Sequence, residues 1–224
     1  MKLTSISIAI CLFILSIGLV HAAAQTPRAR DLFNDFDSSP DRQRPPSKRR
    51  GRPGTKIQME LMRGDGPLKL ASSNTPIFND DRIAFRLAVN YEGYMTVTNI
   101  GTSGQVNLLF AGHVSPTESL RIPATGWIRV AGAKGEEMVN FIMSADPPQG
   151  LPQAGGTEAG ADATGSGSQS VTEKQEILKE LNSRAINRGR DLVAQSEATD
   201  MYVVAPSPQA LSAPHGFSVK LNHK

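Results

Sequence analysis

Cysteine is almost missing from this sequence of 224 residues, since Cys11 is its one representative. Cys11 lies in an apolar run over residues 3–20 that has the character of a removable leader. Without that run the chain has no disulfide framework, no thiol nucleophile and no cysteine-ligated metal site. Its stability in an oxidising compartment must therefore come from a buried core, not from the cross-links typical of small secreted domains.

Long apolar runs are equally scarce, because only residues 3–20 approach the length that spans a bilayer. A lysine precedes this run, and Ala22 and Ala24 follow it at the spacing that signal peptidase reads. We predict a signal peptide over residues 1–24, with Gln25 as the new N-terminus. A retained membrane anchor is the alternative, and serines within the run favour cleavage. The exported chain is then expected in the periplasm or at the outer-membrane periphery of a Gram-negative bacterium, without a transmembrane segment.

Signatures of catalysis are also missing. The histidines that follow the leader, His113, His215 and His223, are widely separated and suggest no metal site. Asp80 and Asp81 are adjacent, but they lie in a turn that opens a strand, where neighbouring side chains point apart. We expect Asp81 to bond turn amides or to pair with Arg82 or Arg86. The sequence predicts no catalytic residue, no metal and no cofactor.

A basic stretch rich in proline is present over residues 25–55, where no apolar periodicity is visible. Such a composition cannot bury enough surface to offset the entropy of ordering, so we predict a disordered arm. Lys48, Arg49, Arg50 and Arg52 are similar to the arginine-glycine core that binds the DNA minor groove in an AT-hook. Export would keep them from the chromosome, which makes nucleic acid an unlikely partner. The binding role that is compatible with export is contact of these basic residues with anionic lipid or polymer of the envelope. The alternative is a solvated arm without a binding role.

Strand patterns dominate residues 56–145. Ile83, Phe85, Leu87 and Val89 alternate with more polar residues at the period of a half-buried strand. Further short strands are separated by turns rich in glycine and proline, including a tight loop at residues 101–104. The pattern predicts an all-β fold, either an antiparallel β-sandwich or a partly open barrel.

The C-terminal third begins with a loop rich in glycine, serine and proline over residues 146–170. A helical segment is predicted over residues 171–195 and would lie at the periphery of the fold. Residues 196–224 are strand-like again, and we expect them to return to the β domain, because two isolated strands are only marginally stable.

Residues 81–86, 92–99 and 103–110 resemble a bacterial domain family known as domain of unknown function 4384. Its hallmark is a D-R-I-x-F-x, G-Y-L and G-x-V-x-L-L-F-P run with a later Ile-Pro and Gly-x-E. Residues 122–123 and 135–137 are similar to those later features, while Ala111 replaces the family's proline. The resemblance implies a β-rich domain of exported proteins, also found appended to catalytic domains without their active residues. The family-like structural positions are Asp81, Arg82, Gly93, Tyr94, Gly104, Phe110 and Pro123.

These features favour a non-enzymatic interaction or accessory module of the cell envelope that binds a protein or an anionic envelope component. Tyr94, Trp127 and Arg129 are candidates for a surface platform, since an exposed tryptophan beside arginines can receive a sugar or peptide. The alternative is an envelope hydrolase or sugar-processing enzyme with an unfamiliar site, and a lesser one is DNA binding by the basic arm.

Overall fold

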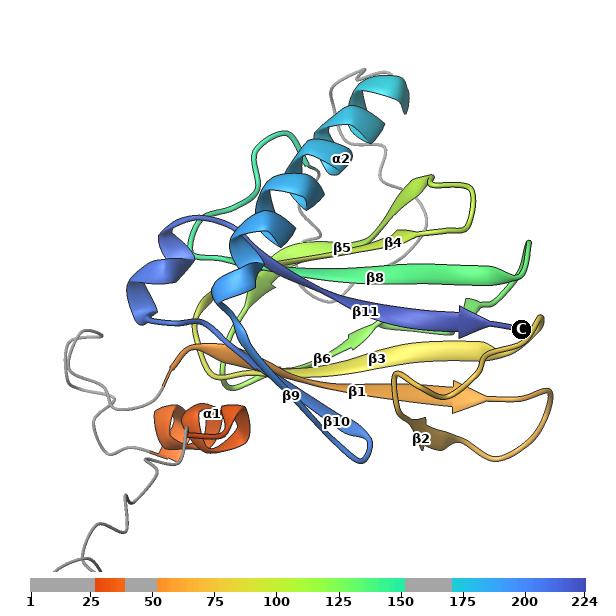
Figure 1. Ribbon diagram of the computed structural model, residues 1–224, viewed down its shortest axis with the longest axis horizontal. Coiled ribbons are helices and arrows are strands. Elements are labelled where there is room, and N and C mark those ends of the chain that lie inside the picture. The colour runs from red at the N-terminus through yellow and green to blue at the C-terminus, as the bar shows by residue number, and fades with distance from the viewer. Residues whose placement is uncertain (1–26, 39–51, 152–170) are drawn as a thin grey trace, which may run out of the picture.

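The computed structural model describes residues 27–38, 52–151 and 171–224 (Figure 1). Two antiparallel sheets face each other as a β-sandwich, and they do not close into a barrel. The first sheet, sheet A, contains β1 (Gly54–Met62), β2 (Lys69–Ala71), β3 (Arg82–Val89), β6 (Ser119–Ile122), β7 (Ile128–Arg129), β9 (Val193–Glu197) and β10 (Asp200–Val204). The second, sheet B, contains β4 (Gly93–Ile100), β5 (Val106–Val114), β8 (Gly135–Ser144) and β11 (His215–His223).

The core lies between the sheets and is built by the alternation that predicted the strands. Ile83, Phe85 and Leu87 of β3 point inward and are buried. Phe85 meets Phe141 of β8 edge to face, with ring centroids 5.4 Å apart. Every second side chain along β1 and β3 therefore points to the opposite, outer surface of sheet A.

The C-terminal strands complete both sheets. β10 pairs with β1 in sheet A, while β11 pairs with β8 along its whole length in sheet B. β9 forms a hairpin with β10 and provides one edge of sheet A. β9 begins at Val193, so the helical segment predicted over residues 171–195 is too long. Its helix α2 (Val171–Arg188) is followed by the short 3-10 helix η3 (Gly189–Asp191).

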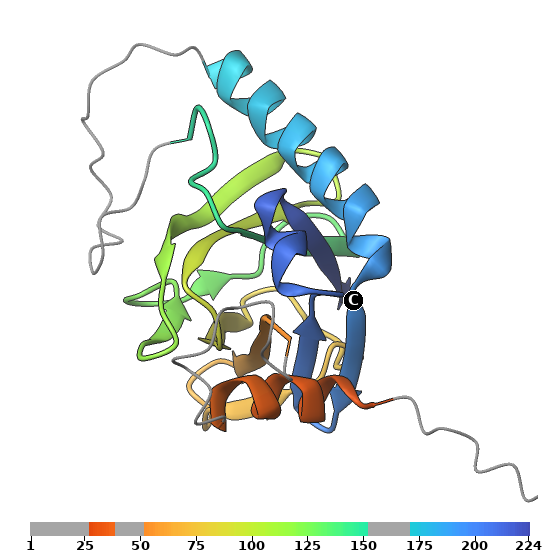
Figure 2. The same ribbon diagram turned by 90° about the vertical axis from the view of Figure 1, so that its left-hand side faces the viewer.

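α2 covers the outer surface of sheet B (Figures 1 and 2). Leu178 packs with Val106 of β5 in a small apolar cluster. Asn182 is buried on the same helix, and its side-chain oxygen accepts hydrogen bonds from Thr98 Oγ1 and Asn140 Nδ2, both at 2.8 Å. Because these buried polar groups satisfy one another, they fix the helix on the sheet in one position.

The N-terminal arm contains an ordered helix, α1 (Ala29–Ser38), on the outer surface of sheet A (Figure 2). Ala29, Leu32 and Phe33 form an apolar stripe that packs on Tyr202 and Val204 of β10. The predicted disordered arm over residues 25–55 is thus wrong for residues 29–38. The stripe packs on a strand that is distant in sequence, and the burial of this apolar surface offsets the conformational entropy lost when the helix becomes ordered.

Candidate functional site

Glu60 lies at the centre of a charged cluster on the outer surface of sheet A. It belongs to β1, and only 2% of its surface is exposed. Arg86 of β3 donates to Glu60 Oε1 from Nε at 3.1 Å and from Nη2 at 2.5 Å. Arg121 of β6 donates from Nε to Glu60 Oε2 at 3.0 Å. One buried carboxylate therefore orients two guanidinium groups from neighbouring strands.

Strand register brings two more arginines to the same surface. Arg86 lies directly opposite Arg121, and Arg82 lies directly opposite Arg129 of β7. Residues that face each other across antiparallel strands project to the same side of the sheet. We call this surface the arginine face, and it consists of Glu60, Arg82, Arg86, Arg121, Trp127 and Arg129.

The ionisation of Glu60 follows from this arrangement. Burial acts to raise the pKa of its carboxyl, but the hydrogen bonds and positive charges of Arg86 and Arg121 outweigh burial and lower the pKa below its ordinary value. Glu60 is therefore a carboxylate at neutral pH. It is unsuited to act as a general acid there, and it serves to hold the two arginines.

Two loop carbonyls and an aromatic ring hold the Arg121 guanidinium in addition to Glu60. Its Nη1 donates to the carbonyl oxygens of Pro123 at 2.8 Å and Gly126 at 2.9 Å. The same guanidinium lies 4.6 Å from the ring centre of Trp127, in a cation–π contact. Trp127 is thus held beside the arginines by the loop that leads into β7.

Two of the other three arginines are exposed, while Arg82 is partly buried. The side chain of Arg86 is half exposed, and that of Arg129 is exposed while it pairs with Asp80 at 2.5 Å. Arg82 has no hydrogen-bond or ion-pair partner within the described ranges. Four arginines face two carboxylates here, so the surface carries net positive charge. Guanidinium groups in such an array can donate paired hydrogen bonds to phosphate or carboxylate oxygens.

The predicted platform of Tyr94, Trp127 and Arg129 is divided between the two sheets. Tyr94 is the second residue of β4 in sheet B, where its ring meets that of His113 edge to face at 5.4 Å. Trp127 and Arg129 belong to the arginine face, but the cation stacked on Trp127 is Arg121. The structure therefore joins two of the three residues in one surface and places Tyr94 elsewhere.

Most of the basic run and the predicted cleavage site lie outside the described residues. This applies to Ala22, Ala24, Gln25, Lys48, Arg49 and Arg50. Arg52 is described, and its main chain is held between α1 and Asn90, the residue that follows β3. Its N–H donates to Leu32 O at 3.1 Å, and its carbonyl accepts from Asn90 Nδ2 at 3.0 Å. Contact of the basic run with a polyanion stays a prediction.

The two adjacent aspartates have separate structural partners. Asp81 accepts from the main-chain N–H of Phe78 at 2.9 Å, which is the turn bond expected from the sequence. Its arginine partner is Arg63, at 3.3 Å, so the expected pairing with Arg82 or Arg86 is wrong. Asp80 has a φ of 71° and pairs with Arg129. Across the described part of the chain, no group of three or more acidic, histidine or cysteine side chains could hold a metal ion.

The other family-like positions have structural roles. Gly104 has a φ of 77° in the tight turn between β4 and β5, where glycine is favoured. A Cβ on Gly93 would lie 2.5 Å from the carbonyl oxygen of Ser144, so the close pairing of β4 with β8 requires glycine. Phe110 packs against the core, and Pro123 supplies the carbonyl that holds Arg121.

Sequence reasoning missed Glu60, which organises the face. In the sequence it is one polar residue in an alternating strand, separated from Arg86 by 26 positions and from Arg121 by 61. The available signal was a carboxylate on the same strand face as Lys56 and Gln58, but the pattern alone does not reveal its burial.

Comparison with known proteins confirms the resemblance to the domain family. Residues 78–147 match the family model described as Domain of unknown function (DUF4384). The match runs from the turn before β3 to the end of β8, so it includes three arginine-bearing strands of the arginine face but not β1 with Glu60. No curated protein and no solved structure matches the chain.

Proposed function

We propose that this protein is a non-enzymatic accessory module of the bacterial cell envelope, which binds phosphate groups of an anionic envelope surface through the arginine face. The observation that carries the proposal is the buried Glu60 with its two arginines. A carboxylate held at 2% exposure orients Arg86 and Arg121, while Arg82 and Arg129 add positive charge beside them. Binding by preoriented arginines loses less conformational entropy than binding by free side chains.

The chemistry of arginine favours phosphate as the ligand. A guanidinium group presents parallel N–H donors that match two oxygens of one phosphate, and it stays charged at any physiological pH. Trp127 adds an amphipathic ring of the type found at membrane interfaces. Anionic phospholipid and lipopolysaccharide both offer this chemistry at the surfaces that an exported protein meets.

The deeply buried carboxylates support a binding role over a catalytic one. Glu60 is committed to Arg86 and Arg121, and Asp81 to a turn amide and Arg63. Each is bound by the strands and turns that surround it, which is the arrangement of a structural ion pair and not of a free acid or base.

The envelope location rests on the signal peptide predicted over residues 1–24, which lies outside the described residues. No helix that the structure describes is long and apolar enough to cross a bilayer. In the proposal, the module reaches the envelope surface by export and remains there by contact with its anionic groups.

Removing charge at the two arginines that do not bind Glu60 tests the proposal. We expect Arg82→Gln with Arg129→Gln to weaken binding to vesicles that contain phosphatidylglycerol. Each basic residue near an anionic surface contributes about 1 kcal/mol, so the pair should weaken binding roughly thirtyfold. Co-sedimentation at low and at physiological salt measures the effect, because screening should reduce the binding of the unmodified protein.

The matched control removes the same charge from the other side of the sandwich. Arg188 and Arg190 are exposed near the end of α2, which covers sheet B. Arg188→Gln with Arg190→Gln should leave vesicle binding nearly unchanged. A second series with purified lipopolysaccharide separates the two phosphate sources. Equal loss in the two double variants would show nonspecific attraction by net charge and would refute a role for the arginine face.

A further inference from the structure

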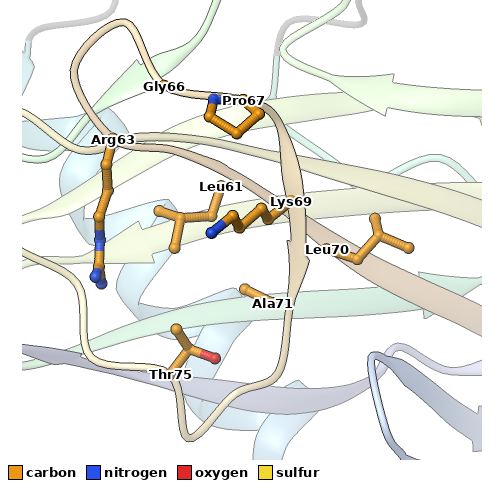
Figure 3. Close-up of a pocket in the computed structure, with 8 residues that line it drawn as sticks. All are labelled: Leu61, Arg63, Gly66, Pro67, Lys69, Leu70, Ala71 and Thr75. Carbon is orange, nitrogen blue, oxygen red and sulfur yellow. The ribbon is translucent and has the colours of Figure 1, made fainter.

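A pocket of about 200 Å³ opens between the end of β1 and the short strand β2 (Figure 3). Its apolar part comes from Leu61, Ala71 and Pro67, and Lys69 and Arg63 extend along it. The remaining lining residues are Gly66, Leu70 and Thr75. The lining therefore combines an apolar floor with two cations and contains no carboxylate.

Exposed apolar side chains gather around this pocket. Leu68 is 50% exposed, Leu70 46% and Phe78 41%, and they are the exposed large hydrophobic residues of the described chain. Leu68 precedes Lys69, the first residue of β2, and Leu70 follows it, while the ring of Phe78 lies 4.7 Å from the guanidinium of Arg63. Scattered exposed apolar residues are ordinary, but their concentration at one place is typical of an interaction site.

β2 also offers main-chain hydrogen-bonding groups. It pairs with β1 on one side, and no described strand pairs with its other side. Asn90 N–H donates to Gly54 O, so the main-chain N–H and C=O groups of Gly54 point toward β3. The same holds for the main-chain groups of every second residue along β1. Leu61 therefore forms its main-chain hydrogen bonds with Lys69. The N–H and C=O of the next residue, Leu70, point away from β1 to the open edge of β2.

The charges at the open edge of β2 determine which kind of ligand it can bind. Arg63 is committed to Asp81 and to the carbonyl of Pro76. Lys69 is exposed and has no hydrogen-bond or ion-pair partner in the described part of the chain. An ammonium group beside an apolar pocket complements a ligand that carries an apolar group and a carboxylate close together.

We propose that the β2 edge binds an extended, acidic and apolar segment of a partner protein as an added strand. The partner residue opposite Leu70 exchanges main-chain hydrogen bonds with it and places an apolar side chain beside Leu70. Side chains alternate along a strand, so the next residue projects to the side of Lys69 and Ala71 and enters the pocket. An acidic side chain of the partner segment, close to this residue, pairs with Lys69. Leu70 lies opposite Glu60 and therefore borders the arginine face, while the pocket beside Lys69 and Ala71 lies on the other side of the sheet, and neither binding event requires the other.

Selection of peptides from a random displayed library on the immobilised protein tests this proposal. The selected peptides should combine adjacent apolar residues with an acidic one. One synthetic selected peptide, labelled with a fluorophore, then serves as the probe for anisotropy titrations. We expect Leu70→Pro, which removes the outward N–H, and Lys69→Glu, which reverses the charge, each to weaken its binding roughly tenfold.

Three further variants keep the result interpretable. Leu70→Asn retains the N–H and removes the apolar contact, so it should weaken binding without the backbone change of proline. By the same alternation, Ser196 N–H points outward from the edge strand β9, and Ser196→Pro should leave peptide affinity unchanged. Arg82→Gln with Arg129→Gln should also leave it unchanged, which distinguishes this site from the arginine face. Circular dichroism confirms that each variant is folded.

Three outcomes would overturn the proposal. The first is a selection that enriches no acidic and apolar peptide. The second is a selected peptide whose affinity is the same for the unmodified protein, Leu70→Pro and Lys69→Glu. The third is concentration-dependent dimerisation that Leu70→Pro abolishes, because the edge would then serve a second copy of this chain.

Discussion

Replacing Gly189 with alanine is expected to lower the free energy of unfolding by about 3 kcal/mol, at the upper end of the cost of overpacking. Gly189 begins η3, directly after α2, where the chain passes over β11. A Cβ at this position would lie 1.7 Å from the carbonyl oxygen of Gly216. The atoms that the Cβ would meet belong to the main chain of Gly216 and cannot rotate away, so α2 and η3 would have to move away from sheet B.

Urea unfolding of the purified protein measures this effect. Gly101→Ala is the matched control, because a Cβ there would have no atom within 4 Å. We expect that control to change the unfolding free energy by less than about 0.5 kcal/mol. An unfolding midpoint for Gly189→Ala equal to that of the control would mean that η3 does not lie against β11.

The second large effect is expected at Glu60. Changing Glu60 to glutamine leaves Arg86 and Arg121 side by side without their carboxylate. Breaking a fully buried ion pair costs about 3–5 kcal/mol. Because Arg86 is half exposed and water screens its charge, we expect a loss of about 2 kcal/mol. Glu136→Gln is the control, since Glu136 pairs with Lys220 at the surface and contributes little.

The pH dependence of this loss provides a second measurement. The pKa of Glu60 is lower in the folded protein than its ordinary value of 4.5. The carboxylate therefore stabilises the fold fully above the unfolded pKa, and this contribution is lost as the pH falls through the folded pKa. The stability difference between the unmodified protein and Glu60→Gln should accordingly shrink as the solution is acidified below that ordinary value. A difference that stays constant into strong acid would contradict the ion pairs with arginine.

Local patterns predicted much of the fold. The alternation along residues 83–89 and the glycine-rich turn at residues 101–104 correspond to β3 and to the β4–β5 hairpin. β2 was missed because three residues are too few to show a period. β9 was missed because its sequence, Val-Ala-Gln-Ser-Glu, has little apolar character and follows directly on a helical segment.

Contacts between distant segments explain what the sequence did not reveal. α1 is held by Tyr202 and Val204, and Phe33 meets the Tyr202 ring at 5.8 Å. Arg63 follows β1 and pairs with Asp81, which precedes the neighbouring strand β3, although Arg82 or Arg86 was expected as the partner. The arginine face depends on register between β1, β3, β6 and β7, which no local pattern specifies. The positions of most strands and the β4–β5 hairpin were thus accessible from the sequence, but the pairings between distant strands were not.

The most direct test of the arginine face is an NMR titration that observes arginine side chains. The probe is glycerol phosphate, a soluble form of a phospholipid headgroup, added to uniformly labelled protein. We predict saturable shifts of the Nε–Hε signals of Arg82, Arg86 and Arg129, with Arg188 and Arg190 unchanged. Shifts of equal size at Arg188 and Arg190, or no saturable shift at the three face arginines, would contradict a phosphate-binding role for this surface.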